Sequence, residues 1–236
     1  TAAEEPSSLQ MSFIETEDLK LIYFDGLNYL APYVVRSAVN STNWQKRTFN
    51  WKPSQRTTVV LNDYADVGHA GASQAPRNYV GVDVAPLSYA FETQPATERF
   101  YYLMNHEQVH TASGDVANAD DRFWRRAFSG KAPVYGQHPE TLLYSYLTIP
   151  RFNTPRWYNE GIAVFMETWM NGGSGRGQGG YDEMVFRAMV RDNARFYDPL
   201  GLASHAVRTS FQVGAMAYLY GGRFITYLAY AHSCLL

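Results

Sequence analysis

The chain has 236 residues, of which 46% are hydrophobic and 18% are charged. With 18 Tyr, 13 Phe and 5 Trp, this balance excludes a disordered polypeptide and is typical of a globular protein with a full hydrophobic core. The formal net charge of -2 gives no long-range attraction to nucleic acid or to anionic lipid. No apolar run approaches the roughly 20 residues that span a bilayer. We therefore expect no nucleic-acid partner and no membrane span.

The single cysteine, Cys234, excludes an internal disulfide and a multi-cysteine metal site. Any metal ligands are therefore expected among His, Asp and Glu. The chain begins at Thr1 without a methionine and ends in an apolar Leu-Leu. We expect from these ends a processed chain, exported to a periplasm or cell surface, that is part of a longer protein.

Strand patterns surround one helical pattern in the first 95 residues. Runs of β-branched and apolar residues predict strands over 19–24, 57–61 and 78–84. Apolar residues at helical spacing predict a helix over 27–40, with the helix proper starting near Pro32. We expect the strand at 78–84 to lie at the edge of the sheet.

The second part of the chain has a helical composition. The glycine-rich run at 171–180 lacks the Lys-Ser/Thr and the preceding strand of a phosphate-binding loop, so we interpret it as a flexible surface loop. The sequence predicts an α+β fold in which a small mixed sheet lobe, 1–95, precedes a mainly helical lobe, 96–236, with the functional site in the cleft between them. The helices of the second lobe are predicted at 96–112, 139–148, 156–171, 181–194 and 210–231.

The string His106-Glu107-Gln108-Val109-His110 lies inside one of these predicted helices. Residues four apart share a face of a helix, so both imidazoles can bind a single metal ion. Glu107 is rotated by about 100° from His106, where it can reach a water held by the metal without being a ligand itself. The string predicts a metal site with Glu107 as its catalytic base.

A catalytic zinc ion usually has three protein ligands, so a third ligand must come from elsewhere. Glu160 is the best candidate, because Pro155 suits a helix start and places this carboxylate about one turn into an otherwise apolar helix. An exposed acid near a helix N-terminus is the ordinary alternative. If Glu160 is not the ligand, the candidates are the acids that follow the histidine helix, Asp115, Asp120 and Asp121.

The motif His-Glu-x-x-His, followed by Trp157-x-x-Glu160-Gly161-x-Ala163, resembles the gluzincin metallopeptidases. That group includes aminopeptidase N, leukotriene hydrolase and thermolysin-like enzymes. The resemblance implies a Zn²⁺ cofactor held by His106, His110 and Glu160, and a peptide or protein substrate. The 50 positions from His110 to Glu160 are more than in the classical aminopeptidases, so an insertion is expected between the two helices.

Three further residues belong to this resemblance or lie close to its motifs. Tyr218, in Tyr218-Leu219-Tyr220-Gly221, matches the tyrosine that stabilises the oxyanion in the aminopeptidase branch. Tyr220 is its rival, and the ordinary alternative is that both tyrosines pack in an aromatic helix. Glu167 lies two helical turns after Glu160, where it either orients a metal ligand or makes an ordinary salt bridge.

The sequence departs from the aminopeptidase branch in one respect. Upstream of His106 nothing matches the Gly-x-Met-Glu-Asn strand whose glutamate binds the free amine of the substrate. We therefore expect an endopeptidase, with an extended peptide bound along the edge strand. The alternatives are a zinc-bound but inactive binding module of a larger envelope protein, and a hydrolase of a nonpeptide bond.

Overall fold

The computed structural model describes residues 10–66, 68–85, 98–203 and 216–232. The α+β class is confirmed, because a small mixed sheet in the first part of the chain precedes a mainly helical part. The predicted helix starts at 96 and 210, like Cys234, lie outside the described residues.

Two compact units make up the chain, Thr1–Ser88 with Glu107–Asn153, and Tyr89–His106 with Thr154–Leu236. The unit that holds the sheet thus includes residues that a division near residue 95 assigns to the helical lobe. Helix α2 (Arg99–Asp115) contributes residues to both units.

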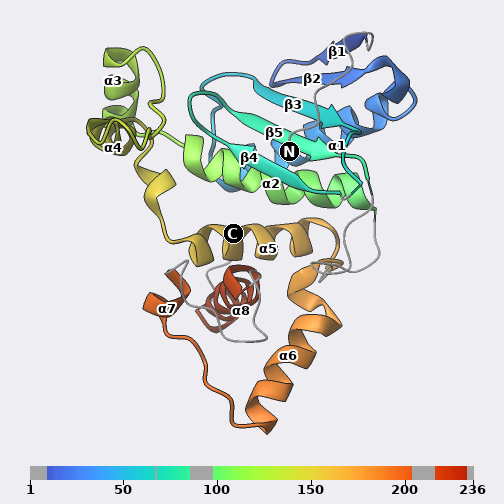
Figure 1. The fold of residues 1–236 in the computed structure, drawn as a ribbon, viewed down its shortest axis with the longest axis vertical. Helices are drawn as coiled ribbons and strands as arrows, with labels where there is room; N and C mark the ends of the chain where they lie inside the picture. The colour runs from blue at the N-terminus through green and yellow to red at the C-terminus, as the bar shows by residue number, and fades with distance from the viewer. Residues whose placement is uncertain (1–9, 67, 86–97, 204–215, 233–236) are drawn as a thin grey trace. The chain divides into compact units, whose positions relative to one another are not determined.

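The sheet has five strands in the order β1-β2-β3-β5-β4 (Figure 1). The inner pairs β2–β3 and β3–β5 are parallel, and the outer pairs β1–β2 and β4–β5 are antiparallel. The strand expected at the edge, β5, is therefore an interior strand, and the short strand β4 is an edge instead. The bounds are β1 Met11–Glu15, β2 Leu19–Phe24, β3 Thr57–Asn62, β4 Ala70–Ser73 and β5 Tyr79–Asp83.

Buried and more exposed side chains alternate along the three central strands, so that one face of the sheet is buried. Leu21 of β2 is in register with Val59 of β3, which is in register with Val80 of β5. All three side chains are fully buried. The alternating pattern therefore places every second residue of these strands in the core.

Helix α1 (Ala31–Thr48) connects β2 to β3 and begins, as expected, beside a proline. The prediction that it ends near Asn40 is wrong. Ser41 and Gln45 continue the buried stripe of the helix at helical spacing, and both are fully buried. Beyond Asn40 the buried face of α1 consists of polar side chains. The apolar pattern therefore ends before the helix does.

A buried carboxylate connects the end of α2 to residues near the sheet. Asp115 accepts hydrogen bonds from the Trp51 indole at 3.0 Å and from the Asn78 amide at 3.1 Å. It also pairs with Lys131 at 2.9 Å and with Arg125 at 3.2 Å. These bonds explain why residues after His106 belong to the same compact unit as the sheet.

Helix α3 (Ala119–Ala127) was not expected from the sequence. It begins with a capping box, in which Asn118 accepts the N–H of Asp121 at 2.8 Å and Asp121 accepts the N–H of Asn118 at 2.9 Å. It is followed by α4 (Glu140–Thr148), which matches the predicted helix there, and by the short helix η2 (Pro150–Asn153).

In the other unit, α5 (Arg156–Met170) packs closely against α8 (Met216–Ala231). Gly161 and Gly221 form the contact. A Cβ atom on Gly221 would lie 2.0 Å from the Trp157 carbonyl oxygen and 2.9 Å from the Gly161 Cα. Only glycine fits at position 221, where the backbones of α5 and α8 approach each other this closely. The remaining helices of this unit are η3 (Arg176–Gln178), α6 (Gly180–Arg191) and α7 (Pro199–Ala203).

No helix in the described part of the chain is long and apolar enough to cross a membrane.

Candidate metal centre

Helix α2 positions both histidines of the motif. The Glu98 carboxylate lies just before the helix and accepts the backbone N–H groups of Phe100 and Tyr101, at 2.9 and 2.6 Å. These bonds satisfy donors that the first helical turn leaves without partners. His106 and His110 follow, one turn apart on one face of the helix.

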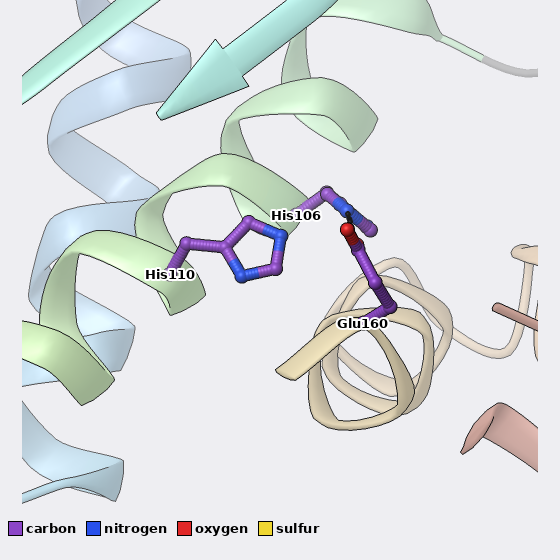
Figure 2. Close-up of side chains that lie close together, drawn as sticks. All are labelled: His106, His110 and Glu160. Carbon is purple, nitrogen blue, oxygen red and sulfur yellow. Dashed lines mark ion pairs between the residues drawn. The ribbon is translucent and has the colours of Figure 1, made fainter. Parts of the chain in front are cut away.

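The two imidazoles and the Glu160 carboxylate point toward one another (Figure 2). His106, His110 and Glu160 each offer one ligand atom, and these atoms all lie within 4.8 Å of one another. His106 is buried, and the other two side chains are half-buried. The Nε2 atom of His106 lies 3.3 Å from a carboxylate oxygen of Glu160. This group can hold a metal ion.

Glu167 fixes the orientation of the His106 ring. Its Oε2 atom lies 2.6 Å from Nδ1 of His106, and its side chain is fully buried. We place the ring proton on Nδ1, where it is donated to Glu167. When the ring loses its second proton, Nε2 has a lone pair on the side of Glu160, which is the arrangement found in histidines that bind metals.

Arg176, which was not predicted from the sequence, holds the Glu167 carboxylate in place. Its Nε and Nη2 atoms donate to the two oxygens of Glu167, both at 2.8 Å, and its side chain is buried. Tyr102 also donates to Glu167, at 2.5 Å. The carboxylate that orients His106 is thus held by a forked arginine contact and a tyrosine.

The glycine-rich run that contains Arg176 is packed against α5, so the prediction of a flexible surface loop is wrong. The backbone N–H of Gly177 donates to the Thr168 hydroxyl at 2.9 Å. A Cβ atom on Gly175 would lie 2.5 Å from the Thr168 Cα. The glycines therefore permit the close approach that brings Arg176 to Glu167. The sequence did contain a signal for this contact, since Arg176 is the one charged residue in the run 171–180.

Buried charges shift the pKa values of this group. Burial lowers the pKa of His106, but the negative charge of Glu167 and hydrogen bonds to Glu160 and Glu167 raise it to about 9. Burial raises the pKa of Glu167, but the charge and hydrogen bonds of Arg176, with those of His106, lower it to about 2. Glu167 is therefore an anion at neutral pH.

Glu107 lies next to His106 in α2, and only 6% of it is exposed to solvent. It is not a member of the group whose ligand atoms converge. The role of Glu107 as catalytic base stays a prediction.

Of the two rival tyrosines, Tyr218 lies beside the histidine. Its ring stacks on that of His106, with centroids 5.9 Å apart, and the Arg176 guanidinium lies 4.7 Å from the centroid of the same tyrosine ring. Burial and the charge of Glu160 raise the pKa of Tyr218 to about 12, so its hydroxyl keeps its proton. Tyr220 instead packs with Phe186, at a centroid distance of 5.1 Å.

The acids at the end of α2 and after it have other roles. Asp115 is occupied by its buried hydrogen bonds. Asp121 caps α3 and pairs with Arg151 at 2.8 Å. Asp120 is exposed in the first turn of α3. None of the three belongs to the converging group found among the described residues.

Comparison of the chain with protein-family models and with curated proteins finds no match. The function is therefore inferred from the geometry and chemistry of this site.

The contact between Glu167 and His106 predicts an effect on metal affinity. Glu167→Gln should weaken metal binding about 10- to 100-fold, because the amide supports the ring less well than a carboxylate does. A competition titration against a coloured chelator measures this affinity. Glu140→Gln, an exposed carboxylate on α4, is the matched control. An unchanged affinity in a folded Glu167→Gln protein would show that this carboxylate does not act on the site.

Proposed function

We propose that the chain is a zinc-dependent peptidase that cleaves internal peptide bonds. The observation that carries this proposal is the convergence of two imidazoles and a carboxylate, with ligand atoms within 4.8 Å of one another. Two histidines and one glutamate are a common protein ligand set of a catalytic zinc ion. The support of His106 by the buried carboxylate of Glu167 also fits a zinc ligand.

The residues around the ligands have matching roles in peptide hydrolysis. When bound, the zinc ion lowers the pKa of a coordinated water and polarises the scissile carbonyl. Glu107 takes the proton from the attacking water and passes it to the leaving amine. Tyr218, protonated at neutral pH, donates a hydrogen bond to the oxyanion that develops on the carbonyl.

The preference for internal bonds has two supports. The sequence lacks the glutamate motif with which the aminopeptidase branch binds a free amine. The strand β4 lies at an edge of the sheet, where main-chain groups can pair with an extended peptide. A substrate bound through its backbone needs no free N-terminus.

Removal of the third ligand tests the metal centre. Purified wild-type protein should contain about one zinc ion per chain, and Glu160→Ala should lose most of it, because two imidazoles remain where three ligands are needed. Elemental analysis of both proteins gives the metal content. Asp192→Ala, an exposed acid that follows α6, should retain the zinc.

Full zinc retention in Glu160→Ala would contradict the ligand assignment. Hydrolysis of a quenched fluorescent peptide library, with and without a chelator, tests the activity separately. Zinc binding with no cleavage of any peptide would contradict the peptidase and favour a binding module.

A further inference from the structure

A hollow of about 660 Å³ lies in the unit that contains the sheet. Its lining includes four basic side chains, Lys52, Arg122, Arg125 and Arg126, and no acidic residue is among its described lining. The basic residues come from the segment after α1 and from α3. A volume in this range is typical of sites for small molecules.

Arg125 is the buried member of this lining, with 9% of its side chain exposed. Its Nε donates to the Thr148 carbonyl at 2.7 Å, and its Nη1 donates to the Asp115 carbonyl at 2.9 Å. Its Nη2 atom is buried and has no hydrogen-bond partner among the described residues. A buried donor of a charged group without an acceptor is costly, so an acceptor in the hollow would stabilise the protein.

The charges behind the hollow do not balance. Asp115 brings one negative charge to a network in which Arg125 and Lys131 are both cations. Burial lowers the pKa of Arg125, even though Asp115 and Asp121 lie close enough to raise it. At the rim, Lys52 and Arg126 are exposed, and neither makes an ion pair with a described residue. The hollow therefore has an excess of positive charge.

We propose that this hollow binds a phosphate group carried by a small molecule or by a lipid headgroup. Arginine forks match phosphate oxygens, and Lys52 adds a point charge. Arg125 lines the hollow, and a phosphate oxygen at its Nη2 would supply the acceptor that this buried donor lacks. The hollow is larger than one phosphate needs, and its lining includes the uncharged residues Asn50 and Ser54, so the group is expected to carry a further moiety.

Titration with inorganic phosphate by calorimetry, at constant ionic strength in chloride, tests the site. The double variant Lys52→Gln/Arg126→Gln should bind phosphate about tenfold more weakly or worse, because two charged contacts are lost. Neither side chain makes a hydrogen bond or an ion pair with a described residue, so the variant should unfold at the wild-type temperature. Arg36→Gln/Arg77→Gln removes the same charge from two exposed positions of the same unit and should bind like wild type.

Sedimentation with phosphatidylcholine vesicles, with and without phosphatidic acid, separates the two sources. Binding of inorganic phosphate without sedimentation supports a soluble ligand. Sedimentation that needs phosphatidic acid and is lost in the double variant supports a headgroup. The proposal is overturned if wild-type protein binds neither probe, or if the double variant binds as tightly as its charge-matched control.

Discussion

Glu107→Gln should retain zinc while its peptide turnover falls by roughly 10²- to 10⁴-fold, the usual contribution of a general base. The substitution keeps the size of the side chain and removes its ability to accept a proton. Glu107 lies outside the group of converging ligand atoms, so the metal content should not change. Elemental analysis and initial rates on one fluorogenic peptide give the two quantities.

Two further variants show what this result means. His110→Ala removes a ligand and should lose both zinc and turnover, whereas Glu140→Gln neutralises an exposed carboxylate on α4 and should keep both. If Glu107→Gln turned over peptide at the wild-type rate, the assignment of Glu107 as base would be wrong. If it lost zinc, Glu107 would act on the metal site directly.

The sequence was most informative where chemistry depends on local spacing. The interval from His106 to His110 is one helical turn, so a helix alone places both imidazoles on one face. Glu160 was predicted as the third member from its position in a second helix together with the resemblance of its motif to the gluzincins, and its ligand atom does lie within 4.8 Å of the histidine nitrogens. The strands β2, β3 and β5 also followed from local composition.

Features that depend on contacts between residues far apart in the sequence were either not predicted or predicted wrongly. The order β3-β5-β4 cannot be read from β5 itself, because the short strand Ala70–Ser73 has no strong strand pattern. The packing of Arg176 on Glu167 requires a turn of the chain that glycines permit but do not specify. Helix α3 is different, since the spacing of Asn118 and Asp121 is a local capping signal that could have been recognised.

The contact between α5 and α8 explains why the two downstream motifs contain glycines. Gly161 follows Glu160, and Gly221 lies three residues after Tyr218, one turn along α8. Because these two glycines touch, they set the distance between the helix that carries Glu160 and the helix that carries the Tyr218 ring. Both residues of the site thus depend on one close backbone contact.

Gly221→Ala should destabilise the protein by about 1–3 kcal/mol or more, because its Cβ would lie 2.0 Å from the Trp157 carbonyl oxygen. That oxygen is part of a helix backbone and cannot move aside without separating α5 from α8. Thermal unfolding should show a melting temperature lower by roughly 2–4 °C for each kcal/mol. Zinc affinity should also fall, because Glu160 moves with α5.

Gly180→Ala is the matched control, since a Cβ atom there meets nothing within 4 Å. It starts α6 in the same unit and should leave stability unchanged or slightly higher, because alanine restricts the unfolded chain. Equal melting temperatures for Gly221→Ala and Gly180→Ala would show that α5 and α8 can separate at little cost. The close glycine contact would then not be what positions Glu160 and Tyr218.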